Sequence, residues 1–202
     1  MTATAPDGRS LVGRTVRLDL AEPRDAEALF QALDDDRVWE MGYGGAKPRP
    51  ESADGWLRAM EQARKDDRVM YVVRLVNADV ALDGRIVGTT SIGDIEIDNE
   101  KAHIGWTAYA PDFWQTTVNP ECKLLLLRHC FEDCGLGRVK IQTDVINVRS
   151  QAAIAKLGAT REGVVRRDMK RSDGTWRDSV VFSVIIDDWP QVEAGLEARL
   201  SG

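Results

Sequence analysis

The segment between residues 102 and 159 contains strand and helix patterns in an order that restricts the fold. Residues 102–109 read as a strand, and after a polar loop residues 121–134 read as a helix. Residues 139–145 read as a second strand, which leads through another polar loop into a short helix. Parallel strands joined through a helix create a crevice at their carboxyl ends, and a helix N-terminus there can bind an anion. The segment therefore predicts an open sheet with a ligand site at this edge.

Further strand and helix patterns lie on both sides of this segment. Asp83-Gly84 and Asp173-Gly174 are turn signals that predict two hairpins. The resulting architecture is a mixed sheet covered by helices, which is an α/β class in the broad sense. The predicted strands are residues 15–18, 69–76, 85–97, 164–171 and 176–186, and the predicted helices are residues 22–33, 52–64, 151–157 and a last one from residue 190.

The length of 202 residues favours one domain, which we place at residues 11–190. Residues 1–10 are small and polar and predict a flexible N-terminal tail, whereas residues 191–202 predict a C-terminal helix or tail. No window approaches the ~20 apolar residues of a membrane helix, and the N-terminus lacks the apolar core of a signal peptide. We therefore expect a cytoplasmic protein with no membrane partner.

The net charge of −6 argues against broad affinity for nucleic acids or anionic membranes, because both require positive surface. It is compatible with a cationic substrate such as an amine. Cys122, Cys130 and Cys134 lie on one predicted helix, and an odd number of cysteines without a secretion signal indicates free thiols. We expect these cysteines to be buried and structural, and we expect no metal site.

Several motifs, in order and spacing, are similar to those of the GCN5-related N-acetyltransferase (GNAT) family, and within it to the RimJ/RimL-like branch. The resemblance covers roughly residues 10 to 190. It implies a central, mostly antiparallel mixed sheet with helices on both faces, in which the strands at 103–109 and 139–145 splay apart around acetyl-CoA. The residues that carry it are 11–18, 104–106, 118–129, 147–150, 153–154, 157–159, 162–167 and 173–174.

The resemblance implies that the loop from Gln115 to Asn119 wraps the pyrophosphate of coenzyme A with backbone N–H groups. The family pattern is Gln/Arg-x-x-Gly-x-Gly/Ala, in which Gln115 matches but Val118 and Pro120 replace the glycines. Valine resists positive φ and proline has no N–H, so we expect altered pyrophosphate binding. The hydroxyl groups of Thr116 and Thr117 are candidate replacement donors. Taken alone, Asn119 followed by Pro120 reads as an ordinary helix cap.

The second polar loop carries further candidates for donor binding. The resemblance implies that Asn147 hydrogen-bonds the pantetheine arm and that Ser150 protonates the departing thiolate. Without the resemblance, the same two residues read as the N-cap pair of a short helix. Lys156 and Arg149 are candidates for pairing with the phosphates of the donor, although solvated surface charges are the alternative.

The strand at 102–109 carries the candidates for catalysis. The resemblance implies that backbone groups of Trp106, Thr107 and Ala108 polarise the thioester carbonyl. His103 titrates near neutrality, which suits a base that takes a proton from the attacking amine. By period two, we expect His103 on one face with Gly105, Thr107 and Tyr109, opposite Trp106.

Alternating acidic residues precede this strand. Asp94, Glu96, Asp98 and Glu100 would share one face of a strand, either as an acidic wall that attracts an amine or as a solvated face. The general base is therefore open among His103, Glu100 and an ordered water. No Cys-His or Ser-His-Asp arrangement is visible, which fits direct attack without a covalent intermediate.

The sequence thus predicts an acyl-CoA-dependent N-acyltransferase that transfers acetyl from acetyl-CoA to a primary amine in a ternary complex. Two alternatives stay open: another donor, such as aminoacyl-tRNA or a carrier-bound acyl group, and a non-catalytic binding protein. The acceptor is a small-molecule or peptide amine, nucleic acid is disfavoured as a partner, and the resemblance suggests a homodimer.

Overall fold

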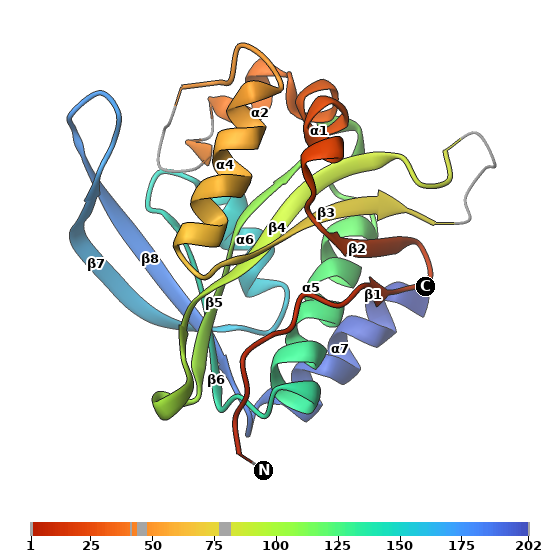
Figure 1. Cartoon of the computed structure of the whole chain (residues 1–202). Coiled ribbons are helices and arrows are strands. Elements are labelled where there is room, and N and C mark those ends of the chain that lie inside the picture. Colours follow the sequence, from red (N-terminus) through yellow and green to blue (C-terminus); the bar gives the residue numbers. More distant parts are fainter. Residues whose placement is uncertain (1, 41, 44–47, 77–81, 202) are drawn as a thin grey trace.

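The computed structural model describes residues 2–40, 42–43, 48–76 and 82–201. Within these residues one sheet has the strand order β1-β2-β3-β4-β5-β6-β8-β7 (Figure 1). Neighbouring strands are antiparallel except β5 and β6, which are parallel. The strands are β1 Leu11–Val12, β2 Val16–Leu20, β3 Val69–Leu75, β4 Ile86–Glu96, β5 Lys101–Tyr109, β6 Arg138–Asp144, β7 Thr160–Lys170 and β8 Trp176–Ile185.

Helices cover both faces of the sheet, as predicted (Figure 1). One apolar cluster joins a sheet face to α5 and α7, through residues such as Leu126, Ile104 and Leu196. A second cluster joins the opposite face to α1 and α4, through residues such as Leu29 and Met60. The helical elements are η1 Pro23–Asp25, α1 Ala26–Leu33, α2 Asp36–Trp39, α4 Asp54–Lys65, η2 Ile97–Asn99, η3 Pro111–Phe113, α5 Val118–Arg128, η4 His129–Asp133, α6 Val148–Ala155 and α7 Trp189–Ser201.

The predicted parallel unit is present as β5, α5 and β6. The ladder between β5 and β6 runs from Lys101 opposite Arg138 to His103 opposite Lys140. Beyond His103, β5 continues along β4, and β6 continues along β8. The two strands therefore part after His103, which produces the splayed gap that the sequence predicted.

A β-bulge in β5 changes which side chains share a face. Ser91 pairs with Gly105 and Thr89 pairs with Ala108, so Trp106 and Thr107 together lie opposite Thr90. Trp106 has a left-handed conformation with φ of 50°. As a result Trp106 lies on the face of His103, with 4.9 Å between the ring centroids, and Thr107 turns toward α5. The prediction of strict period two along β5 is therefore wrong beyond Gly105.

The N-terminal segment packs against the body of the protein, which corrects the prediction of a flexible tail. Thr4 donates its backbone N–H to the carbonyl oxygen of Cys134 at 2.8 Å, and Ala3 is buried. Arg9 pairs with Asp7 at 2.9 Å and lies 3.8 Å from Asp133.

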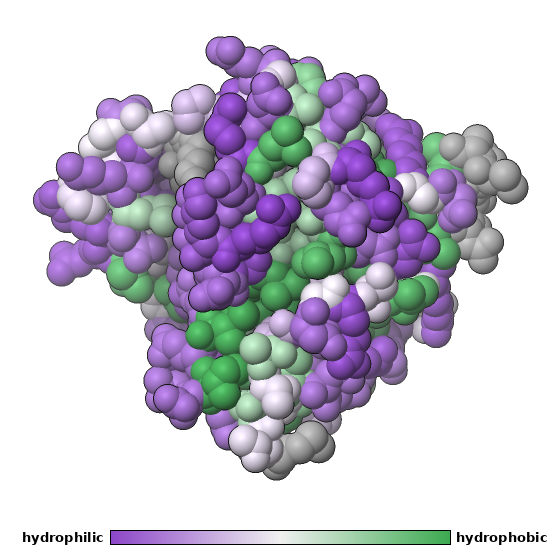
Figure 2. Space-filling model, viewed as in Figure 1, coloured by the Kyte–Doolittle hydropathy of each residue, from purple (hydrophilic) through white to green (hydrophobic). Residues whose placement is uncertain are grey.

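Figure 2 shows a band of hydrophobic residues across the face that carries the N-terminal segment. The band lies between α4 and that segment, within a mostly hydrophilic surface.

The helix after the first polar loop has different ends from those predicted. It begins at Val118 with Thr117 as the N-cap, so Asn119 lies inside the first turn and is not the cap. It ends at Arg128 and continues as a π-helix, His129–Asp133. Beside this wider turn, Nε2 of His129 lies 3.7 Å from Sγ of Cys134. All three cysteines are free and buried, as predicted.

Candidate functional site

The two polar loops meet at the mouth of the gap between β5 and β6. The guanidinium of Arg149, in the first turn of α6, stacks on the Trp114 ring at 3.6 Å from its centroid. The indole N–H of Trp114 donates to the carbonyl oxygen of Tyr109 at 2.9 Å, which ties this contact to the end of β5. The N-termini of α5 and α6 are thereby brought together. Partial burial lowers the pKa of Arg149, but the group stays cationic at neutral pH.

The loop before α5 achieves its turn without the missing glycines. Gln115 takes the left-handed conformation, with φ of 63°, and Val118 is helical. Thr116 donates its hydroxyl to the carbonyl oxygen of Phe113 at 2.7 Å and accepts the N–H of Val118 at 3.3 Å. The first turn of α5 therefore presents fewer N–H groups than usual, because Thr116 engages one and Pro120 has none. Thr116 and Thr117 are exposed, but Thr116 can donate to an incoming ligand only if its hydroxyl releases the carbonyl oxygen of Phe113.

The loop before α6 confirms that Asn147 caps this helix. Asn147 is the N-cap, and its side-chain oxygen accepts the N–H of Ser150 at 2.9 Å. Ser150 is half-buried in the first turn, near the mouth of the gap. Lys156 is exposed at the C-terminal end of α6, away from that first turn.

His103 has one ring nitrogen bonded to a carboxylate and one that no described residue engages. Its ring is buried, and Nδ1 donates to Oδ2 of Asp94 at 3.2 Å, while Asp94 also pairs with Lys140 at 3.0 Å. Its other nitrogen, Nε2, is buried without a hydrogen-bond partner among the described residues. Burial lowers the pKa of His103, so the ring is neutral at pH 7 and Nε2 can accept a proton. His103 and Lys140 lower the pKa of Asp94, which stays ionised and orients the ring.

Two glycines leave room for this arrangement. A Cβ on Gly105 would lie 2.7 Å from Cε1 and Nε2 of the His103 ring. A Cβ on Gly93 would lie 2.9 Å from the Trp106 ring. Both positions therefore need glycine so that the two rings can pack beside the bulge.

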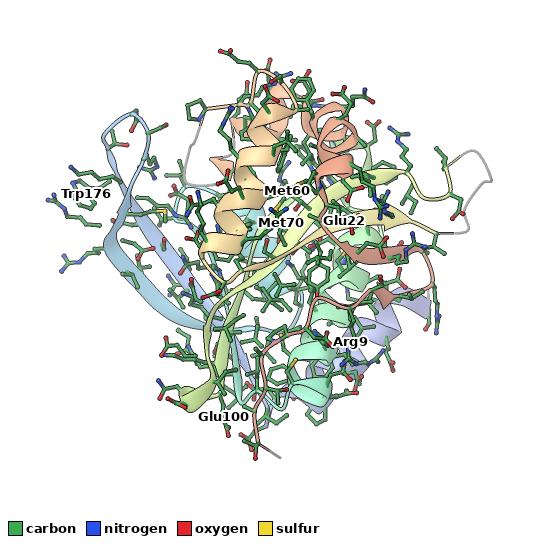
Figure 3. The ribbon with its side chains drawn as sticks, in the orientation of Figure 1. Arg9, Glu22, Met60, Met70, Glu100 and Trp176 are labelled. Atoms are coloured by element: carbon green, nitrogen blue, oxygen red, sulfur yellow. The ribbon has the colours of Figure 1, made fainter. Side chains whose placement is uncertain are left out.

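Of the four carboxylates in the predicted acidic wall, Asp94 joins the site through His103, whereas the wall as a whole does not form and Glu100 lies elsewhere. Glu100 lies in the turn between β4 and β5, where its carbonyl oxygen accepts the N–H of Gly137 at 2.7 Å. That turn precedes β5, so Glu100 lies roughly 20 Å along the chain from Trp106 at ~3.3 Å per residue, and Figure 3 shows Glu100 at the lower end of the molecule. The predicted row of four carboxylates on one strand face does not form, because Asp94 has positive φ and Ile97–Asn99 is a 3-10 turn.

The sequence interpretation missed one cationic residue beside the bulge. Lys123, on α5, is buried, and its Nζ donates to the hydroxyl of Thr107 at 2.8 Å and to that of Thr90 at 3.4 Å. A polar residue within the apolar run 122–127 was the available signal. On the other face, Tyr43 donates its hydroxyl to the carbonyl oxygen of Trp106 at 3.2 Å.

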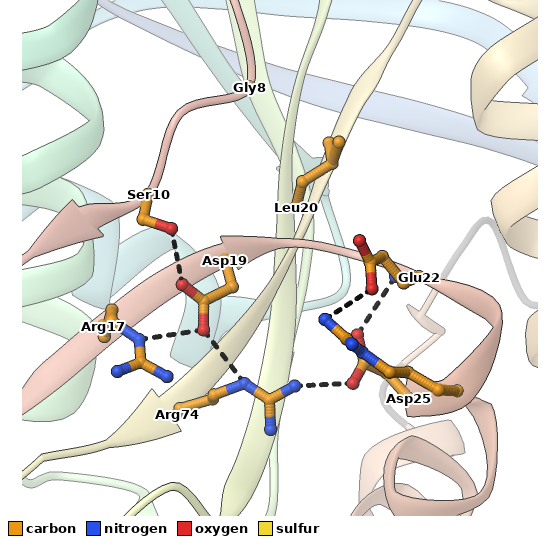
Figure 4. A pocket seen from close by; sticks show the side chains of 9 residues that line it. Gly8, Ser10, Arg17, Asp19, Leu20, Glu22, Asp25 and Arg74 are labelled. Carbon is orange, nitrogen blue, oxygen red and sulfur yellow. Dashed lines mark hydrogen bonds and ion pairs between the residues drawn. The ribbon is translucent and has the colours of Figure 1, made fainter.

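A surface pocket elsewhere on the molecule has a structural explanation (Figure 4). It lies beside β2, and its charged side chains pair with one another. Arg74 contacts Asp19 at 3.0 Å and Asp25 at 2.5 Å, and Ser10 donates to Asp19 at 2.7 Å. Because these groups satisfy each other, the pocket offers no charge to a ligand.

Two searches of the described part of the chain found no candidate. No cluster of three or more His, Cys, Asp or Glu side chains there has an arrangement that could hold a metal ion. In the same residues, no helix combines the length and the apolar character needed to cross a membrane.

Comparisons with known proteins agree with this geometry. The sequence profile of the Acetyltransferase (GNAT) domain matches residues 15–160. The chain is 27% identical over 179 residues to a Bacillus subtilis (strain 168) protein named "Putative ribosomal N-acetyltransferase YdaF", covering 88% of this chain and 95% of that protein.

Solved structures show the same fold. The "putative acetyltransferase" of T. thermophilus is 33% identical, with a TM-score of 0.81 over 95% of this chain and 97% of that one. Mycobacterium smegmatis RimJ, solved in complex with CoA-disulfide, is 23% identical, with a TM-score of 0.77 over 96% of both chains.

Proposed function

The chain belongs to the GNAT acetyltransferase family, and we propose that it transfers acetyl from acetyl-CoA to an amino group of a protein or peptide by direct attack in a ternary complex. The observation that carries this proposal is the gap between β5 and β6. A bulged strand, a histidine with a buried acceptor nitrogen and two helix N-termini all border it. This arrangement can hold an anionic acyl donor at its mouth and a reacting carbonyl at the bulge.

In the proposed reaction the acceptor amine attacks the thioester carbonyl carbon, the C–S bond breaks, and coenzyme A leaves as a thiolate. Nε2 of His103 takes the proton that the amine loses, and Asp94 stabilises the resulting imidazolium. Backbone N–H groups at Trp106–Ala108 polarise the carbonyl, which in comparable sites contributes about 2.7–4 kcal/mol. Ser150 passes a proton to the thiolate and regains one from solvent water, so that coenzyme A leaves the enzyme as the thiol. The rest of the rate enhancement comes from holding the two substrates together.

Donor binding combines several weak contacts. Thr116, Thr117, Asn119 and the helix dipole of α5 would hold the pyrophosphate, and Arg149 would add the charge that the loop lacks. Asn147 would contact the pantetheine arm, and Lys156 would reach only outlying phosphates. These assignments rest on placement beside the gap and on the family pattern.

The acceptor is proposed from the relatives and from charge. The name of the curated relative refers to a ribosomal N-acetyltransferase, and a solved neighbour is named as a ribosomal-protein-serine acetyltransferase. A net charge of −6 suits a basic protein substrate. His103 and Trp106 face the side of the sheet covered by α4, where Trp39, Tyr43 and Trp56 pack together, so we place the acceptor on that side.

The first test is calorimetric titration of the purified protein with acetyl-CoA, with desulfo-CoA and uncharged tRNA as controls. Micromolar binding is expected for acetyl-CoA and also for desulfo-CoA, which keeps the pyrophosphate and pantetheine contacts, but not for uncharged tRNA. Peptides with the N-termini of ribosomal proteins, and spermidine as a small amine, then compete as acceptors in an assay for released thiol. Absence of binding at millimolar acetyl-CoA would overturn the proposal and favour another donor or a non-catalytic role. Sedimentation in the same buffer tests the proposed homodimer.

A further inference from the structure

Lys123 is a buried cation that no acidic group neutralises. Only 4% of the residue is exposed, and its Nζ contacts the hydroxyl groups of Thr107 and Thr90. Among the residues that the structure describes, the contacts of this ammonium group are hydroxyl groups, and no carboxylate acts on its charge. Lysine is almost never fully buried unless it is paired, because desolvation of the charge is costly. A buried and unpaired lysine at this position therefore needs a function that offsets the cost of desolvating its charge.

The position of Lys123 connects it to the bulge. Thr107 follows Trp106 directly, and its hydroxyl lies 2.8 Å from that of Thr90 and 3.3 Å from the carbonyl oxygen of Gly105. Lys123 therefore closes a polar cluster that holds the bulged residues of β5 against β4 and α5. The other helical neighbours of the cluster are apolar, so the charge acts in a region of low dielectric.

We infer that Lys123 is a positioning residue for acyl transfer: it anchors Thr107, and its positive charge stabilises the negative charge that develops on the thioester oxygen at the bulge. This inference rests on the proposed function of the gap. Lys123 acts through Thr107 and the backbone of β5 and need not touch the donor. Its effect belongs to the transition state, so kcat should change more than the KM for acetyl-CoA.

The charge on Lys123 depends on pH in a testable range. Burial lowers the pKa of Lys123 to about 8. On its own helix, the pKa of Cys122 is raised to about 12, so this thiol does not titrate near pH 8, and Glu121 is bonded to Thr15. From β5, His103 has a lowered pKa and Tyr109 a strongly raised one, and β4 contributes only the hydroxyl of Thr90. The pH window near 8 therefore belongs to Lys123.

The test is Lys123→Met in the full chain, with steady-state kinetics and thermal unfolding measured from pH 6.5 to 10. Below pH 8 we expect kcat to fall by roughly 10- to 100-fold, less than for loss of a direct oxyanion donor, with little change in KM. Removal of a buried unpaired charge should raise Tm at pH 7 by about 5 °C. Above pH 8 the ratio of wild-type to variant kcat should fall toward 1. Lys65→Met, on an exposed turn of α4, is the matched control and should change neither kcat nor Tm.

The outcomes separate this inference from the proposed function. A variant with unchanged kcat and raised Tm would overturn it, since Lys123 would then be a tolerated charge only. A lowered Tm with loss of activity at every pH would also overturn it, because Lys123 would then be a structural anchor. If wild-type protein neither binds acetyl-CoA nor releases thiol, the proposed function fails first and the role of Lys123 fails with it.

Discussion

Two polar clusters beside the same sheet differ in whether their charged groups are paired by other residues of the protein. In the cluster around Arg74, the guanidinium meets Asp19 and Asp25, and Arg17 adds a further contact to Asp19 (Figure 4). In the cluster around the β5 bulge, Lys123 meets only hydroxyl groups, and Nε2 of His103 meets no polar atom in the described part of the chain. Burial alone does not distinguish the two clusters. The difference lies in whether the protein itself completes the interactions.

This difference indicates what each cluster does. A complete set of ion pairs stabilises the fold, and removal of one member leaves another charge uncompensated. An incomplete set lowers stability and persists where a ligand or a transition state completes it. The Arg74 cluster therefore joins β2, β3 and the start of α1, whereas the bulge cluster is prepared for chemistry. Substitutions in the two clusters should separate stability from activity.

The largest expected effect is on activity, from His103→Gln. Glutamine keeps much of the volume and cannot act as a base, so kcat should fall by about 10²- to 10⁴-fold. On the acid side, the wild-type kcat should decrease as pH falls through the lowered pKa of His103, below the value of about 6.5 for an ordinary histidine. Steady-state kinetics between pH 5 and 9 measure both effects. Equal rates for variant and wild type would assign the proton transfer to a water.

The same variant carries a stability signature. As pH falls below about 6.5, the unfolded chain binds a proton at His103 that the folded protein resists, so wild-type stability decreases toward the folded pKa. In His103→Gln this decrease should be smaller. Denaturant titrations at pH 7.5 and 5 check the sign, which would be reversed if the folded protein favoured the charged ring.

Arg74→Met should have the opposite result, with a loss of stability and a normal kcat. The variant leaves Asp25, a buried carboxylate, without its cationic partner. Because Arg74 is 19% exposed, we expect the free energy of unfolding to fall by about 2–3 kcal/mol, below the value for a fully buried pair. Arg17→Met is the matched control, since its pair is exposed and should contribute less than about 1 kcal/mol. If kcat were also reduced at a low temperature at which the Arg74→Met variant stays folded, the two clusters would be coupled.

The contrast also explains which features the sequence could reveal. The β5-α5-β6 unit follows from local periodicity, and the anchored loop before α6 follows from the Asn147 cap, so both were predicted. The bulge depends on how β4 pairs with β5, which period-two reasoning cannot detect, and it moved Trp106 to the face of His103. The Asn119-Pro120 pattern did not mark the start of α5, which begins at Val118 after a turn in which Gln115 takes the left-handed conformation, and Thr117 makes no side-chain cap bond. Lys123 became interpretable only when its surroundings were known to lack a carboxylate.

Substitution of Asn147 should affect both the stability of the protein and the binding of acetyl-CoA. Asn147→Ala removes the cap on Ser150 and should lower the free energy of unfolding by about 1 kcal/mol. It should also raise the KM for acetyl-CoA if the amide contacts the pantetheine arm. Asn147→Asp is the discriminating variant, because aspartate keeps the cap but loses the amide donor. Stability close to wild type with a KM raised by about 10-fold, the cost of roughly one hydrogen bond, would support donor binding. A normal KM in Asn147→Asp would leave Asn147 as a cap only.

The smallest effect is expected from Ser150→Ala. A thiol with a pKa of ~8.5 leaves readily as its thiolate, so a proton from Ser150 accelerates a step that is already easy. We therefore expect kcat to fall only by about 3- to 10-fold, at the low end of acid catalysis. Ser52→Ala, beside the start of α4 and far from the gap, controls for loss of a hydroxyl near a helix N-terminus and should leave kcat unchanged. A loss as large as that of His103→Gln would mean that Ser150 belongs to the proton path from the amine, and the division between a base at the bulge and an acid at α6 would have to be abandoned.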